Sequence, residues 1–276
     1  MAGMPVSAFT TSYMFQMNAL QAMRHLGEMG YRRFTVLVSP PHFWVPQLSA
    51  QERKEMPGQL AQHGLEIAAL CFPSIDNNLT SFAAELRRES VNAVKEVLTL
   101  AGEWGIGNVV VIPGKVSPLL PPPPDLPMQC FVETFQELAE HAKSTGTRIL
   151  VENVPMSAFP HATDVMRALD ALDDDSVGIL YDFANGTFVG DDPCADLRLV
   201  KDRLGMCDAS DTGAELFRHG PIGTGIVPFE RIADTLREIG YQGVTAVEMI
   251  VKDDPDTAFR EATKKLAQWG WELAGG

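Results

Sequence analysis

Five segments of the chain share one pattern of polar and apolar positions. Each reads as a helix end, a glycine, a short turn and then an apolar, mostly β-branched run, at residues 26–38, 60–72, 101–113, 141–153 and 236–249. Glycine suits the left-handed backbone that closes a helix, and a near-continuous apolar run is typical of a parallel strand buried on both faces. The repeated unit predicts helices that alternate with parallel strands.

Weaker copies of the unit complete the set. VGILYD and LGMCD follow helical stretches, and VSAFTT precedes the helix NALQAMRHLGEMG. We therefore expect eight strands, at about residues 6–10, 34–38, 66–72, 108–113, 148–152, 177–182, 204–208 and 244–249. Eight strands that alternate with helices predict an α/β fold, a single (β/α)8 TIM barrel that occupies residues 1–276 as one domain. An open doubly wound sheet is the alternative, but no GxGxxG follows the first strand.

The composition narrows the classes of function. The chain has 36 acidic and 22 basic residues, and its formal charge of −14 would repel both a phosphate backbone and an anionic membrane surface. No run of about 18 apolar residues offers a membrane span, and the N-terminus does not look like a signal peptide. The four cysteines lack CxxC spacing, which favours reduced thiols. We expect a cytoplasmic protein that binds neither nucleic acid nor membrane.

The last four strands each end on an acidic residue. These residues are Glu152, Asp182, Asp208 and Glu248. Because adjacent strands lie about 4.8 Å apart, the four carboxylates should converge on one side of the barrel mouth, where they cannot all ionise without a cation. A single acid of this kind would be read as a helix cap or an ion-pair partner, but the same register four times in succession predicts a metal site. Oxygen donors suit Mn²⁺ or Mg²⁺ best, with Co²⁺ or Zn²⁺ as further options.

Several other residues on the predicted rim are candidates for substrate binding. Lys115 follows strand 4, and Arg218 and His219 follow strand 7, where they could hold hydroxyls, a carboxylate or a phosphate. His42 and Trp44 follow strand 2 and could form a wall against a sugar ring or an apolar aglycone. The alternative for each is an ordinary surface or loop-packing role.

Two loops on the same face stand out. The GPIGTG segment is rich in glycine but lacks the Walker Lys-Ser/Thr, so we interpret it as a loop of close backbone approach. Residues 116–127, VSPLLPPPPDLP, predict a stiff rim loop, because consecutive prolines favour polyproline II. A surface loop, a lid or an oligomer contact are all compatible with it.

Five motifs resemble those of the xylose isomerase-like TIM barrels, a superfamily of sugar isomerases and epimerases. They are VEN at 151–153, YDFAN at 181–185, CDASD at 207–211, HGPIGTG at 219–225 and REIGYQGVTAVE at 237–248. The resemblance to the ketose 3-epimerases of this superfamily implies that Glu152 and Glu248 both bind the metal and move the proton, and that Asp182 is a third ligand. It also implies a homo-oligomer, a dimer or a tetramer.

The sequence departs from the family pattern at two positions. Asp208 stands where the family has a metal-binding histidine, so either Asp208 is the fourth ligand or His219 reaches in from the following loop; we favour Asp208. Asn185 stands where several relatives have a histidine, so a substrate contact there is open. Endonuclease IV, in the same superfamily, needs histidines for its zinc cluster, but here strands 4 and 6 end in IPGK and YDFAN, which argues against DNA repair.

The candidate chemistry is proton transfer next to a carbonyl. A divalent ion chelated by an α-hydroxy ketone acidifies the adjacent C–H, because the enediolate binds the metal more tightly than the ketone does. We predict a metal-dependent isomerase or epimerase of a sugar or keto-sugar in carbohydrate metabolism. The alternatives are a dehydratase that acts on a keto-cyclitol or keto-sugar, similar to the inosose or 3-dehydroshikimate dehydratases, and a catalytically silent barrel that binds a metabolite.

Overall fold

Eight parallel strands form a closed barrel in the computed structural model, which describes residues 3–273. Each strand pairs with the next along the chain, and β1 pairs with both β8 and β2, which closes the barrel. The predicted (β/α)8 TIM barrel is confirmed. The strands are β1 (Met4–Phe9), β2 (Arg33–Leu37), β3 (Glu66–Phe72), β4 (Asn108–Val111), β5 (Arg148–Glu152), β6 (Gly178–Asp182), β7 (Leu204–Ala209) and β8 (Thr245–Val247).

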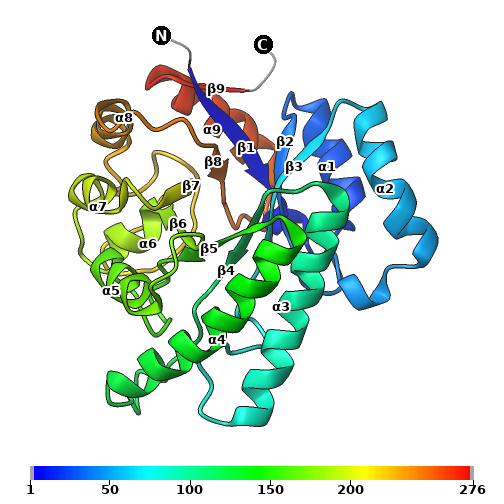
Figure 1. The fold of residues 1–276 in the computed structure, drawn as a ribbon. Coiled ribbons are helices and arrows are strands. Elements are labelled where there is room, and N and C mark those ends of the chain that lie inside the picture. Colours follow the sequence, from blue (N-terminus) through cyan, green and yellow to red (C-terminus); the bar gives the residue numbers. More distant parts are fainter. Residues whose placement is uncertain (1–2, 274–276) are drawn as a thin grey trace.

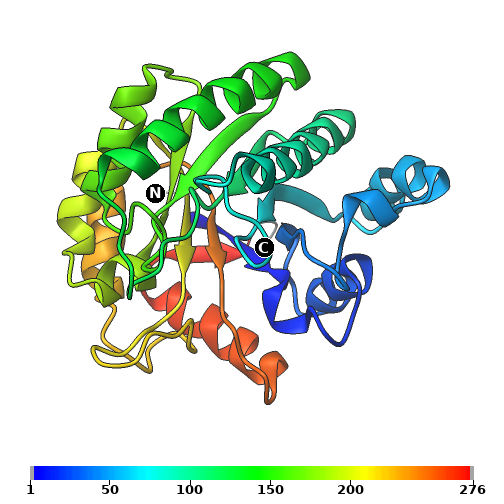
Figure 2. The same cartoon turned by 90° about the horizontal axis from the view of Figure 1, so that it is seen from below.

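The helices surround the strands on the outside (Figures 1 and 2). They are α1 (Ala19–Glu28), α2 (Ala50–Gln62), α3 (Ala84–Trp104), α4 (Asp125–Thr145), α5 (Ala162–Leu172), α6 (Phe183–Phe188), α7 (Pro193–Val200), α8 (Phe229–Glu238) and α9 (Pro255–Gln268), with two 3-10 turns, η1 (Thr10–Tyr13) and η2 (Val45–Gln47). Gly105 and Gly146 close α3 and α4 in the left-handed conformation, as the repeated pattern predicts. Within residues 3–273, no helix combines the length and apolarity that crossing a bilayer requires.

Two elements differ from the prediction, apart from shifts of one or two residues at strand ends. Helix α4 begins at Asp125, so the last three residues of the expected 116–127 loop belong to a helix. A ninth strand, β9 (Trp271–Leu273), pairs in parallel with the start of β1, as Figure 1 shows. Its Trp271 is buried, and the indole Nε1 donates to Thr245 Oγ1 of β8 at 3.0 Å. These three residues form a strand because they contact β1 and β8. The repeated sequence pattern does not extend to them, so it did not predict β9.

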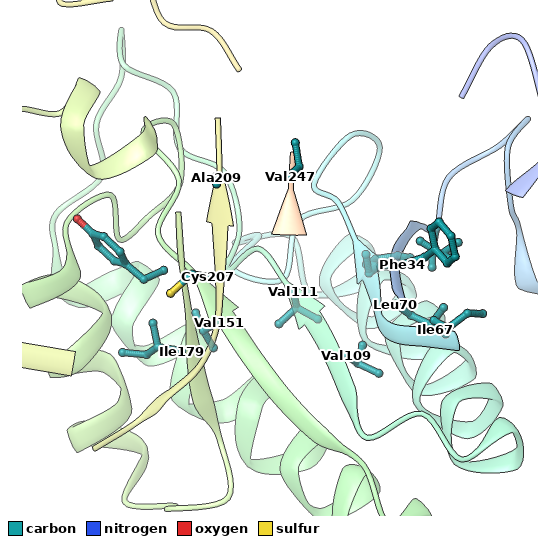
Figure 3. Packing of buried hydrophobic residues seen from close by; sticks show 14 of the residues in the cluster. Phe34, Ile67, Leu70, Val109, Val111, Val151, Ile179, Cys207, Ala209 and Val247 are labelled. Carbon is teal, nitrogen blue, oxygen red and sulfur yellow. The ribbon is translucent and has the colours of Figure 1, made fainter. Parts of the chain in front are cut away.

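The alternation of side chains along the strands divides the core into two parts. Residues such as Val109, Val151 and Cys207 belong to the large cluster that packs between strands and helices (Figure 3). The residues between them form a smaller cluster that fills the barrel interior: Phe9, Leu37, Ala69, Cys71, Val110, Leu150, Leu180 and Met206. A one-residue slip would exchange the two faces, and burying each large apolar side chain contributes about 1.5–3 kcal/mol, so the register is strongly fixed.

Candidate metal centre

The barrel register explains why acids converge at the mouth. Glu152, Asp182 and Asp208 each lie two positions after an inward-facing residue of the interior cluster, so their side chains also point inward. Asp182 and Asp208 are direct neighbours in the pairing of β6 with β7. Glu248 follows the end of β8, where its backbone N–H donates to Ala209 O at 3.0 Å and continues the pairing.

The four carboxylates form one buried group. Glu152, Asp182, Asp208 and Glu248 each offer one oxygen, and these four oxygens lie within 4.8 Å of one another. Asp182 and Asp208 are fully buried, and Glu152 and Glu248 are 4% and 9% exposed. The structure thus brings together the four residues that the sequence predicts as metal ligands.

Two asparagines orient these acids. Asn185, in the first turn of α6, donates from Nδ2 to Glu152 Oε1 at 3.1 Å, and its backbone N–H donates to Asp182 Oδ1, so Asp182 caps the helix. Asn153, which the sequence analysis did not select, accepts from the backbone N–H of Asp182 at 2.9 Å. Its position directly after Glu152, at the end of a predicted strand, is the sequence feature that could have indicated a role at this site.

Burial and the neighbouring negative charges favour the protonated forms of Glu152, Asp182 and Asp208. Burial raises the pKa of Glu152 and of Asp208 well above their usual values, and the charges of the other acids act in the same direction. Burial also raises the pKa of Asp182 to about 7, although the neighbouring His219 acts in the opposite direction. Bringing four carboxylates this close together costs free energy that a divalent cation would recover.

The hydrogen bonding supports the same conclusion. Both carboxylate oxygens of Asp208, and Oδ2 of Asp182, are buried and find no hydrogen-bond donor among residues 3–273. A buried polar atom without a partner costs about 1–3 kcal/mol, more when it is charged. These oxygen donors fit a hard divalent cation.

His219 reaches the same centre from the loop after β7. Its Nδ1 lies 3.1 Å from Glu248 Oε2 and 3.8 Å from Asp182 Oδ2, and it forms a second group of possible ligands with these two residues. Burial alone would lower the pKa of His219, but the charges of Glu248 and Asp182 outweigh it and raise the pKa to about 10. Asp208 and His219, treated as alternatives from the sequence, therefore both lie at the centre.

The other predicted substrate-binding residues lie outside this group. His42 is buried and uses both ring nitrogens, with Nδ1 2.7 Å from Met17 O and Nε2 2.8 Å from Thr10 Oγ1. Arg218 is exposed, and its guanidinium donates to Thr224 O within its own loop at 3.0 Å.

A cavity of about 760 Å³ lies between the loops that follow β2, β3 and β4 and the N-terminal half of α3. Trp44 lines it and stacks on Phe72, with ring centroids 6.2 Å apart. Lys115 also lines it, and its Nζ donates to Ile75 O at 2.5 Å. Two of the predicted substrate-binding residues thus share a space that is lined by different strands from those that carry the acids.

Comparison with known proteins identifies the family. The family model for xylose isomerase-like TIM barrels matches residues 23–269, so the chain belongs to this family. A fructoselysine 3-epimerase of Shigella flexneri is 21% identical over 255 residues, which cover 89% of this chain and 91% of the relative.

Solved structures share the fold over the full barrel. A D-tagatose 3-epimerase-like protein superimposes with a TM-score of 0.82 at 20% identity and covers 96% of this chain and 99% of its own. The IOLI protein with a bound zinc atom gives a TM-score of 0.81 at 16% identity and covers 96% of each chain. The resemblance stated from the motifs is confirmed at the level of the family.

Proposed function

We propose that this protein is a divalent-metal-dependent epimerase or isomerase that acts on a sugar or keto-sugar. The observation that carries the proposal is the buried group of four carboxylates from β5 to β8, in which both oxygens of Asp208 have no donor in the described part of the chain. The family supports the substrate class, since the relatives reported above include a fructoselysine 3-epimerase and a D-tagatose 3-epimerase-like protein.

Glu152, Asp182, Asp208 and Glu248 would hold the cation. When bound, a divalent cation supplies a Lewis acid that polarises the carbonyl of an α-hydroxy ketone and acidifies the neighbouring C–H. The all-oxygen carboxylate set favours Mn²⁺ or Mg²⁺, with Co²⁺ and Zn²⁺ as further options.

Glu152 and Glu248 would carry the proton. They come from β5 and from the end of β8, two strands that do not pair with each other, so they can approach a substrate from different sides. One carboxylate removes the proton from the carbon next to the carbonyl. The other returns a proton to the opposite face of the same carbon for epimerisation, or to the neighbouring carbon for isomerisation. Asn185 fixes the orientation of Glu152 through Oε1.

The test begins with metal analysis of protein purified without chelator and a Mn²⁺ titration. We expect about one ion per chain, followed by metal-dependent exchange of the α-proton of a keto-sugar in D₂O, monitored by ¹H NMR across a panel of ketoses and keto-cyclitols. Glu152→Gln and Glu248→Gln should each abolish the exchange. Glu66→Gln is the matched control, because Glu66 is exposed at the opposite end of a strand.

Three outcomes would contradict the proposal. No metal binding at millimolar concentration would remove its basis, and wild-type exchange in either glutamine variant would exclude that residue from proton transfer. Absorbance from a new conjugated enone, in place of an epimer, would identify the reaction as a dehydration.

A further inference from the structure

A buried aspartate outside the metal group organises the loop after β7. Asp211 is 1% exposed, and its carboxylate accepts three backbone N–H bonds, from Thr212 and Val227 at Oδ1 and from Gly225 at Oδ2, over 2.8 to 3.1 Å. No basic side chain within residues 3–273 pairs with it. Backbone N–H groups therefore provide the partners of this buried carboxylate. Two of the three, those of Gly225 and Val227, lie well beyond Asp211 in the sequence, just before helix α8.

The backbone of the same residue holds the near end of the loop. Asp211 and Gly220 form an isolated antiparallel bridge, with N–H to O distances of 3.0 and 2.7 Å in the two directions. Asp211 thus binds residues at both ends of the segment 219–227, which we call the 219–227 loop. Gly225 is required at its place, because a Cβ there would overlap Asp211 Oδ1 and the carbonyl oxygen of Thr212.

The residue next to this bridge is His219. Its backbone carbonyl accepts from Ile250 N at 2.8 Å, and its Nδ1 lies 3.1 Å from both Ser210 Oγ and Glu248 Oε2. No helix or strand contains His219, so its position depends on the conformation of the loop. A loop residue held at 3.1 Å from a buried carboxylate needs a fixed backbone on both sides.

We propose that Asp211 is a positioning residue that fixes the 219–227 loop and so supplies His219 Nδ1 as a fifth donor beside the four carboxylates, an inference that rests on the proposed metal site. Asp211 touches neither metal nor substrate, and acts through the position of His219.

The test is a double-mutant cycle on metal affinity. Asp211→Asn keeps the shape of the side chain but removes its charge, and we expect its Kd for Mn²⁺ to rise about tenfold, the scale on which residues that orient a ligand act. In the His219→Ala background the same change should add less than twofold. The visible absorption of the Co²⁺-loaded Asp211→Asn protein should shift toward that of His219→Ala. Asp174→Asn is the control, because Asp174 also accepts a backbone N–H, from Ser176, but lies outside the metal group.

Two results of this cycle would overturn the proposal: an unchanged Mn²⁺ affinity in Asp211→Asn, or an equal loss with and without His219. If Asp211→Asn does not fold, Asp211→Glu takes its place in the cycle, because it keeps the charge and displaces the carboxylate by one methylene from the N–H groups of Gly225 and Val227. A wild-type protein that binds Mn²⁺ but epimerises no substrate would refute the proposed function, whereas the double-mutant cycle on Mn²⁺ affinity would still test the role of Asp211.

A second measurement, made in EDTA, tests the same proposal without bound metal. Long-range ¹H–¹⁵N NMR of the six histidine rings, with His219 assigned from His219→Ala, should show Asp211→Asn moving the His219 resonance alone. An unmoved resonance would refute the positioning role even if the wild-type protein bound no metal.

Discussion

Replacing Asp208 by asparagine should stabilise the protein in EDTA and weaken its response to metal. Asp208 is buried among three other carboxylates, with oxygens within 4.8 Å and no donor of its own in the described chain. At an effective dielectric constant of about 20, one pair of like charges at that distance costs roughly 3.5 kcal/mol. Asparagine has nearly the same shape and carries no charge, so it removes this repulsion.

The stability that Asp208→Asn gains over the wild type depends on pH, and the raised pKa values determine the direction of that dependence. Burial raises the pKa of Asp208 well above its usual value and that of Asp182 to about 7, so the folded protein retains protons that the unfolded chain has released. The stability of the wild type in EDTA should therefore fall as the pH rises from about 4 toward 7 and above. At pH 8 we expect Asp208→Asn to be about 3 kcal/mol more stable, a rise in Tm of roughly 6 °C for a chain of this size. Near pH 4 the two proteins should melt together.

Added metal should remove most of this difference. Mn²⁺ at about 100 times its Kd stabilises the wild type by roughly 2.7 kcal/mol, close to the advantage that Asp208→Asn has in EDTA, and the variant, which lacks one ligand, should gain much less. The assay is thermal denaturation followed by circular dichroism at pH 4 and 8, in EDTA or Mn²⁺, with Asp174→Asn as the control. An Asp208→Asn protein that melts below the wild type in EDTA at pH 8 would refute the idea that these acids repel one another.

Three other predictions concern metal affinity, acid stability and packing. By calorimetry, Asp208→Ala should weaken Mn²⁺ binding more than His219→Ala; the reverse ranking would make the histidine the stronger ligand. Burial raises the pKa of Asp196 to about 6 although Tyr181 OH donates to it. In urea denaturation, the wild type should therefore lose about 1–2 kcal/mol of stability relative to Asp196→Asn between pH 4 and 6, and an equal pH dependence of the two proteins would disprove this. His42→Ala should cost about 2–3 kcal/mol in thermal denaturation, because the side chain is buried and both ring nitrogens are bonded, while Mn²⁺ affinity stays constant; an unchanged Tm would contradict the packing.

The sequence predicts the barrel and its four acids because both appear as a pattern that recurs at regular spacing along the chain. Apolar runs mark the eight strands, and an acid at the same register after each of the last four places the carboxylates together. Strand β8 ends at Val247 rather than at 249, but the backbone of Glu248 still bonds to Ala209. β9 has no such mark, since its three residues become a strand only through pairing with β1.

Loop residues were less accessible to prediction. The position of His219 depends on contacts of Asp211 with residues 9 to 16 positions further on, Gly220, Gly225 and Val227, and no periodic pattern reports them. The hydrogen bonds of His42 to Met17 and Thr10 arise in the same way from a meeting of two loops. Sequence spacing places such residues on the rim, but only the folded loops decide whether they face the centre.

The division of the barrel mouth has a consequence for engineering. The acids are carried by β5 to β8, whereas the 760 Å³ cavity is lined by the loops after β2, β3 and β4 and by the N-terminal half of α3. A mutant library confined to Ile75, Asp76 and Asn77 would reshape the cavity while the backbone that carries the carboxylates stays intact. The two halves of this rim can therefore be diversified independently, and a variant selected for a new cavity shape would keep an intact set of donors.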